Sequence, residues 1–210
     1  MSEGHSPIYS NPVLYNLVMR VLYGSHFEDR YRALIDEIPD GTRVVDLCCG
    51  DCYIYSHYLK QKQVEYLGLD LSPRLIQSAQ RRGIQARQFD VWSDPIPPAD
   101  IVMMQASLYH FIPHTGPIIQ RMLASAHQKV LISEPIQNLS SSDNPILAAI
   151  GRLGTRPGGE TDLYKGQRFV EQTLMVVFAS TGALERSFLI PGGREMIGVF
   201  PNRSPRRPNP

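Results

Sequence analysis

The stretch VVDLCCGDCYIY, residues 44–55, places an apolar run, an acid and then three cysteines around one glycine. An apolar run followed by small residues is typical of a strand that turns into a helix, where parallel α/β sheets bind ligands. Cys49 and Cys52 also have the C-x-x-C spacing of a dithiol or of part of a metal site. The stretch therefore leaves three interpretations: a ligand-binding loop, thiol or metal chemistry, and small buried side chains that fill a crowded turn.

Short apolar runs continue along the chain and alternate with helical stretches, of which residues 72–83 are the best delimited. Ser72 is a suitable cap there, Pro73 a suitable first residue and Gly83 a suitable end. The strand candidates are residues 43–47, 64–70, 86–91, 100–105 and 129–134, followed by two runs at 183–190 and 194–200 around the turn PGG. The sequence thus predicts an α/β fold: a doubly wound, Rossmann-like, mostly parallel seven-stranded sheet with an antiparallel C-terminal hairpin.

The length of 210 residues suits one domain, which we place at residues 1–200. Helical spacing at residues 11–24 and 27–38 predicts N-terminal helices before the first strand, and we interpret residues 1–40 as a helical lid. The sequence PNRSPRRPNP has almost nothing to bury, so residues 201–210 are expected to form a disordered tail.

The charge balance limits the partners. Lys and Arg number 21 against 20 Asp and Glu, so no large basic field favours nucleic acid. No stretch approaches the roughly 20 apolar residues of a membrane span. The three clustered cysteines fit a reducing, cytoplasmic setting better than a disulfide framework, and no pattern specifies an oligomeric state.

Acidic residues stand near the ends of three successive strand candidates. Asp46 closes the first, Asp70 follows 24 positions later, and Asp90 belongs to the third. The carboxyl ends of parallel strands meet at one edge of a doubly wound sheet, so these carboxylates are expected to converge around a nucleoside. An acid at the second strand tip suits the two hydroxyls of a ribose.

These motifs give the chain a family resemblance. VVDLCCGDC, YLGLDLS and RQFDVW resemble the first three motifs of the class I S-adenosylmethionine-dependent methyltransferases, and ADIVMMQASLYHF and KVLISEP are similar to their fourth and fifth strands. The similarity covers about residues 40–200, and no G-x-G-x-x-G of a dehydrogenase is present. Where the family has three glycines this chain has Cys48, Gly50 and Cys52, which motivates an alternative: a cofactor-binding module that does not catalyse.

The resemblance implies S-adenosyl-L-methionine as the cofactor. It assigns the methionine part to Asp46, Cys48 and Gly50, the ribose to Asp70, the adenine to Leu71, Asp90 and Val91, and the position under the sulfonium to Gln105. Tyr15 and Tyr23 on the first helix either cover the cofactor or pack in the core.

Methyl transfer needs a base only if the acceptor must lose a proton. The candidates for catalysis are Tyr109 and His110, directly after the fourth strand, and Glu134 at the fifth strand tip, which equally suits a cap for the following loop. The apolar piece PILAAIGRL, residues 145–153, either lines the site of an apolar small-molecule acceptor or packs as ordinary core.

Overall fold

A computed structural model describes residues 17, 19–21, 23–136 and 168–202. The described chain forms one seven-stranded sheet in the order β3-β2-β1-β4-β5-β7-β6, in which β7 is antiparallel to both of its neighbours, β5 and β6, and the other neighbouring strands are parallel. The strands are β1 (Arg43–Leu47), β2 (Glu65–Asp70), β3 (Ala86–Gln88), β4 (Ala99–Gln105), β5 (Ala126–Pro135), β6 (Arg186–Leu189) and β7 (Glu195–Pro201). This topology confirms the predicted fold.

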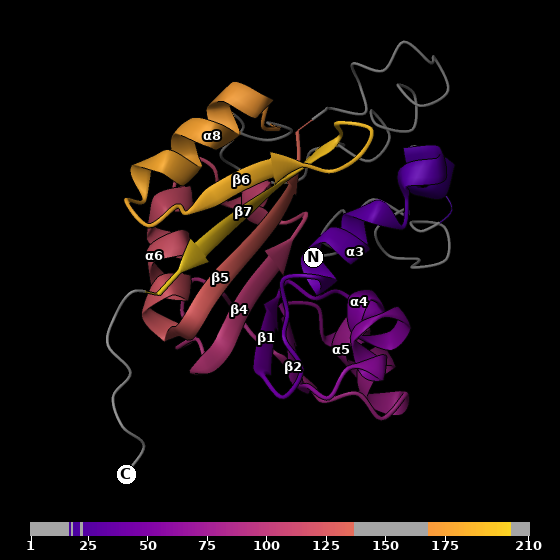
Figure 1. Ribbon diagram of the computed structural model, residues 1–210. Helices are drawn as coiled ribbons and strands as arrows, with labels where there is room; N and C mark the ends of the chain where they lie inside the picture. The colour runs from indigo at the N-terminus through magenta and orange to yellow at the C-terminus, as the bar shows by residue number, and fades with distance from the viewer. Residues whose placement is uncertain (1–16, 18, 22, 137–167, 203–210) are drawn as a thin grey trace, which may run out of the picture.

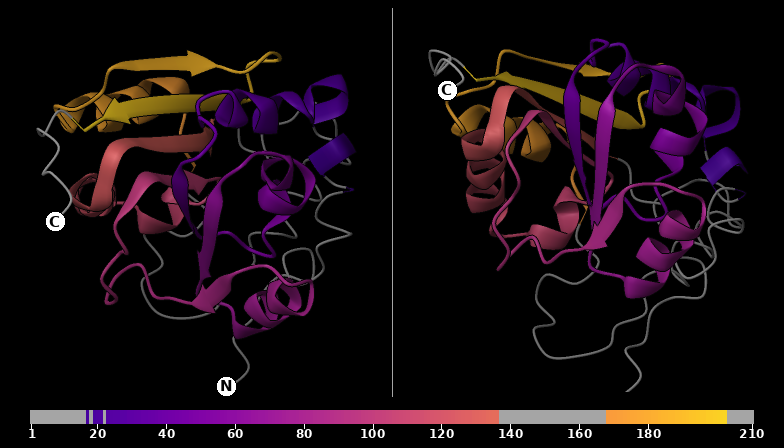
Figure 2. Two further views of the ribbon diagram at one scale, coloured as in Figure 1. Left: turned by 60° about the horizontal axis from the view of Figure 1, so that its bottom comes forward. Right: turned by 90° about the horizontal axis from the view of Figure 1, so that it is seen from below.

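Helices cover both faces of the sheet (Figures 1 and 2). The longer helices α6 (Thr115–Ser125) and α8 (Glu171–Ser180) lie on one face, and α3 (Asp29–Ile35), α4 (Tyr53–His57) and α5 (Pro73–Arg81) lie on the other. Short 3-10 turns complete the set: η1 (Gly24–His26), η2 (Leu59–Gln61) and η3 (Leu108–Phe111). Within the described residues no helix is both long and apolar enough to cross a bilayer.

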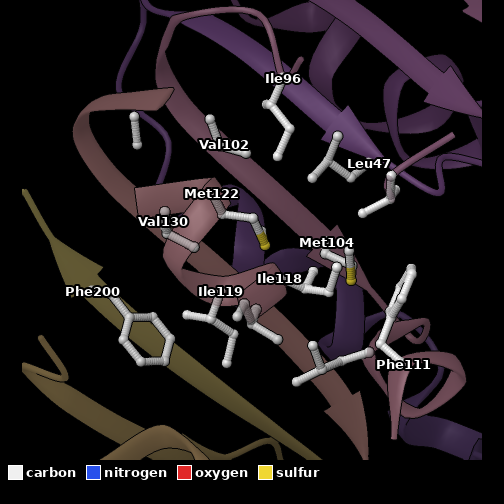
Figure 3. Close-up of a cluster of buried hydrophobic side chains, with 14 of the residues drawn as sticks. Leu47, Ile96, Val102, Met104, Phe111, Ile118, Ile119, Met122, Val130 and Phe200 are labelled. Carbon is white, nitrogen blue, oxygen red and sulfur yellow. The ribbon is translucent and has the colours of Figure 1, made fainter. Parts of the chain in front are cut away.

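Strand β4 contributes side chains to the hydrophobic clusters on both faces of the sheet. Val102 and Met104 pack on the side of α6, where Ile118 and Met122 meet them, as Figure 3 shows. Ile101 and Met103 belong to the cluster on the opposite face. Successive side chains of a strand point to opposite faces, so an unbroken apolar run is what a strand buried on both sides requires.

The boundaries follow local side-chain chemistry. Ser72 caps α5, with its hydroxyl oxygen 3.4 Å from the Leu75 amide that donates to it. Strand β3 ends at Gln88, earlier than the predicted residue 91, because Asp94 accepts a hydrogen bond from the Asp90 amide and turns the chain away.

Strand β7 extends to Pro201, which pairs with Lys129 on β5. The next residue, Asn202, donates its backbone amide to the Gln128 carbonyl oxygen, so the first two residues of the predicted tail adjoin the sheet. Residues 203–210, Tyr15, most of the predicted first helix and the piece at 145–153 lie outside the described residues.

The packing of α8 on β7 generates the first prediction. A Cβ at Gly198 would lie 2.7 Å from a ring carbon of Phe178 and 2.8 Å from one of Phe200, two rings that meet edge to face. Gly198→Ala should therefore lower the free energy of unfolding by about 1–3 kcal/mol through overpacking. Gly116→Ala in α6, where a Cβ meets nothing within 4 Å, is the matched control and should leave stability unchanged or raise it. Urea unfolding measures both, and equal stabilities would contradict the packing described.

Candidate functional site

Backbone strain marks one edge of the sheet. Three non-glycine residues of the described chain have positive φ, namely Cys48 (56°), Cys52 (60°) and Ala106 (51°). Each such residue costs about 1–3 kcal/mol, and strained residues cluster at functional sites. Cys48 and Ala106 follow the ends of β1 and β4, the neighbours at which the strand order reverses, and this switch point is where doubly wound sheets bind ligands.

The loop after β1 has a backbone that normally calls for glycine. Gly50 has φ of 58°, so residues 48, 50 and 52 all adopt the left-handed conformation although two of them are cysteines. Strand β2 makes the room: a Cβ at Gly68 would lie 2.6 Å from the Cys52 sulfur and 2.9 Å from the Cys49 sulfur. The thiols of Cys49 and Cys52 thus lie against the backbone of β2. The glycine in YLGLD is the sequence signal for this arrangement.

The thiols are poorly suited to nucleophilic chemistry. Burial raises the pKa of Cys48, and the hydrogen bond between Cys49 and Cys52, whose sulfurs are 3.5 Å apart, raises the pKa of Cys49. A reactive dithiol requires a lowered pKa. All three cysteines are free, and the described residues contain no group of three or more metal-ligating side chains. The raised pKa values and the packing against β2 therefore favour the interpretation of compact buried side chains over dithiol chemistry.

Asp70 ties the loop to the next strand. One carboxylate oxygen accepts from the Gly50 amide at 2.8 Å, and the other accepts from the Ser72 amide at 2.8 Å. Burial raises the pKa of Asp70, and these two bonds act in the opposite direction. A carboxylate has about four acceptor positions, so Asp70 can still accept from two hydroxyl groups.

A second carboxylate lies beneath the loop. Asp46 is buried within β1 and accepts from the Tyr66 hydroxyl at 2.7 Å. Burial raises the pKa of Asp46 to about 7, and the nearby charge of Asp70 adds to the shift. Burial is the largest cause of the raised pKa of Cys48, and the charges of Asp70, Asp46 and Glu134 add to it, so these three acids lie near Cys48. Such a cluster favours a cationic ligand.

The third predicted acid, Asp90, lies two residues beyond β3 and accepts from the Trp92 amide at 2.9 Å. Val91 between them is buried. Leu71 and Trp92, which follow β2 and β3, are large apolar side chains with exposed fractions of 63% and 50%. Exposed apolar surface beside two strand tips is suited to a flat ring.

Glu134, predicted as a base or a cap, is fully buried. Its oxygens accept from the amides of Leu108, at 2.8 Å, and Tyr109, at 3.4 Å. Burial raises the pKa of Glu134 to about 8. Glu134 thus caps η3, the turn after β4, whereas the loop that follows its own strand lies outside the described residues from residue 137 on.

Tyr109 and His110, both in η3, lie against each other with ring centroids 3.9 Å apart. The guanidinium carbon of Arg168 lies 3.5 Å from the centroid of the Tyr109 ring. Desolvation, followed by the charge of Arg168, lowers the pKa of His110 to about 4, so its imidazole is neutral at pH 7. Arg168 had not been foreseen, because only the folded chain brings it to the tip of β4.

A buried polar network on the other side of the β4 tip was also missed. Tyr23, predicted to cover the cofactor or pack in the core, is buried and donates its hydroxyl to Glu195 at 2.9 Å. Glu195, the first residue of β7, also pairs with Arg30 of α3 at 3.0 Å. Gln105 ends β4 with its amide nitrogen 3.4 Å from a Glu195 oxygen. The sequence signal was a Glu at the start of the apolar strand MIGVF.

The raised pKa of Asp46 makes stability depend on pH. The folded state binds this proton up to about pH 7 and the unfolded state only up to about 4, so the free energy of unfolding falls as pH rises from 4 towards 8. Asp46→Asn should remove roughly 2–4 kcal/mol of that decline. Urea unfolding at pH 5 and pH 8 checks this, and the same decline in the variant would show that Asp46 does not cause it.

Comparisons with known proteins agree with this geometry. The model of a methyltransferase domain family matches residues 23–159. Among solved structures, a chain from the complex of the Haloferax volcanii Trm112 methyltransferase activator with a putative methyltransferase has a TM-score of 0.67 and 12% identity, over 96% of this chain and 99% of that one. The magnesium protoporphyrin IX methyltransferase of Synechocystis, with bound S-adenosylhomocysteine, has a TM-score of 0.61 and 18% identity over 91% and 87%.

A TehB-like S-adenosylmethionine-dependent methyltransferase from Corynebacterium glutamicum has a TM-score of 0.56 and 16% identity over 90% and 98% of the two chains. At these identities the structures show a common fold, whereas the family model covers more than half of the chain. No curated protein matches the sequence. The family model shows that this chain belongs to the methyltransferase-domain family, and its fold is that of the S-adenosylmethionine-dependent methyltransferases.

Proposed function

We propose that this enzyme transfers the methyl group of S-adenosylmethionine to a small organic acceptor, at the carboxyl edge around β1, β2 and β4. The observation that carries the proposal is the strained loop at residues 48–52, whose Gly50 amide binds the carboxylate of Asp70. That bond sets a short backbone segment beside an acid that still has free acceptor positions. A nucleoside with a cationic tail matches both features.

The cofactor lies along the strand tips in this proposal. Asp70 accepts from the ribose hydroxyls, and Leu71, Asp90 and Val91 border the adenine. The loop at Cys48 and Gly50 faces the methionine part, which carries an ammonium and a sulfonium charge. These positive charges are favoured beside the charge of Asp70, which raises the pKa values of Asp46 and Cys48.

The lid and the acceptor site complete the assignment. We assign residues 1–40 as a helical lid of a single domain spanning 1–200; Tyr15, expected in that lid, lies outside the described residues. Tyr23 acts from beneath, through the bond from its hydroxyl to Glu195. The acceptor binds beyond β4, beside Tyr109 and His110.

The chemistry makes modest demands on the protein. S-adenosylmethionine supplies a methyl group already activated by the positive sulfur, so the chain's own residues chiefly align the two reactants and exclude water. His110 is neutral at pH 7 and can accept a proton from an acceptor group that must lose one. Glu134 supports this step by fixing the first two amides of η3, the turn that carries His110 and Tyr109.

Two observations support a small acceptor. The nearly balanced charge, 21 basic against 20 acidic residues, lacks the field that a nucleic acid substrate requires. One structural neighbour, by its name, methylates magnesium protoporphyrin IX, a small molecule. The two cysteines at positions usually held by glycine motivated the non-catalytic alternative. Cys48 and Cys52 nevertheless have positive φ, the conformation that glycine adopts readily, so they give little support to that alternative.

Asp70→Asn tests the cofactor site. The substitution removes the charge that binds the ribose hydroxyls, so the affinity for S-adenosylmethionine should fall by about 10-fold to 100-fold, as expected for hydrogen bonds to a charged group. Isothermal titration calorimetry measures it. Asp40→Asn, an exposed acid in the turn before β1 at the opposite edge of the sheet, should bind like the wild type. Equal affinities for all three proteins would exclude Asp70 from the site.

The acceptor class is tested by incubating the enzyme and cofactor with a labelled methyl group in a cell extract. We expect a labelled compound that passes a small-pore filter and separates from the cofactor by chromatography, and much less of it with Asp70→Asn. Label confined to protein or nucleic acid would overturn the small-molecule assignment.

His110→Gln tests the base. The variant keeps a hydrogen-bonding side chain but cannot take up the proton, so kcat should fall by about 10²-fold to 10⁴-fold with the affinity for the cofactor unchanged within twofold. Steady-state kinetics with the acceptor from that screen, together with calorimetry, separates the two effects. An unchanged kcat would remove His110 from the mechanism.

A further inference from the structure

Gln105 occupies the central position at the edge of the sheet. It ends β4 one residue after Met104, which pairs with Leu47 of β1, so it lies beside the start of the strained loop at Cys48. Its side-chain nitrogen is 3.4 Å from the Arg30 carbonyl oxygen and 3.4 Å from Oε1 of Glu195. The amide therefore has two partners on the side of α3 and β7.

Both partners fix which way the amide faces. A backbone carbonyl and an ionised carboxylate only accept hydrogen bonds, so the Gln105 nitrogen must point at them and the oxygen must point away. No hydrogen bond from a described residue reaches that oxygen, and Gln105 is only half-buried. The oxygen is thus an oriented acceptor at the strand tip.

Glu195 is itself held rigidly. Ser133 donates its hydroxyl to Oε1, the oxygen that meets Gln105, while Tyr23 at 2.9 Å and Arg30 at 3.0 Å donate to Oε2. Both Glu195 and Arg30 are buried, with exposed fractions of 0% and 1%. The guanidinium also lies over the Tyr23 ring at 4.6 Å. The pair thus joins α3 and the N-terminal helical residues to β5 and β7.

We propose that Glu195 and Arg30 are positioning residues that hold the Gln105 amide so that its oxygen accepts a hydrogen bond from the ammonium group of the bound cofactor. The proposal rests on the cofactor placement given above and adds a role for two residues distant from the strained loop in sequence. It also gives the first helices a function in binding: they orient an acceptor that they do not themselves provide.

The test compares two ligands. S-adenosylhomocysteine carries the ammonium group, whereas 5′-methylthioadenosine has the same nucleoside and sulfur without the amino-acid part. Calorimetry should show that Gln105→Met lowers the affinity for S-adenosylhomocysteine by at least tenfold and changes the affinity for methylthioadenosine by less than twofold. Equal weakening of both ligands would overturn the proposal, because it would indicate general damage to the site.

A double variant tests whether Glu195 acts through Gln105. Glu195→Gln alone should lower the affinity for S-adenosylhomocysteine at least fivefold. In a protein that already carries Gln105→Met, it should cause no further loss of affinity. Independent, multiplying losses would overturn the positioning role. The matched control is Glu37→Gln, a glutamate just after α3 that pairs with Lys129 of β5 and Arg186 of β6, and this variant should leave both affinities unchanged.

Should Glu195→Gln fail to fold, Ser133→Ala replaces it, since this change frees the same carboxylate oxygen while the ion pair with Arg30 remains. It should weaken S-adenosylhomocysteine selectively, and an unchanged affinity would overturn the proposal. A wild-type protein that binds neither ligand refutes the cofactor site itself, whereas wild-type binding that none of these variants alters refutes only the positioning role.

Discussion

The hydrogen bond from the Gly50 amide to the Asp70 carboxylate is the interaction on which the rest of the site depends. It joins the loop after β1 to the tip of β2, two segments that the parallel register already brings side by side. Burial raises the pKa of this half-buried carboxylate, and the hydrogen bond donated by the loop lowers it. The loop thus has an anchor, and the bond acts against the rise in the pKa of Asp70.

The same bond explains how a loop usually built from glycines accommodates cysteines. The left-handed conformation at residues 48 and 52 is strained for any side chain, and Asp70 helps to hold the backbone in it. The cysteine side chains also need space that glycine would not. Gly68 leaves this space on β2 for the Cys49 and Cys52 sulfurs. The thiols thus occupy volume beneath the loop, whose amides at Cys49, Gly50 and Cys52 donate to Leu69, Asp70 and Cys49.

Local patterns predicted those parts of the molecule that local forces determine. The strands, the terminal hairpin and the Ser72 cap follow from periodicity and turn chemistry within a few residues, and the acids at strand tips follow once parallel strands are assumed. Arg30 and Glu195 are 165 positions apart, and the sequence around each residue does not indicate which residue it pairs with. Likewise Glu134 caps a turn 26 residues earlier, and Asp94 shortens β3 through one side-chain bond that no propensity encodes.

A crystal structure of the enzyme with S-adenosylhomocysteine examines the whole arrangement at once. It should show both ribose hydroxyls within hydrogen-bonding distance of the Asp70 carboxylate and the amino-acid part against the backbone of residues 48–50. A nucleoside bound away from β2, with Asp70 still bonded only to Gly50 and Ser72, would contradict the placement of the site at this edge of the sheet.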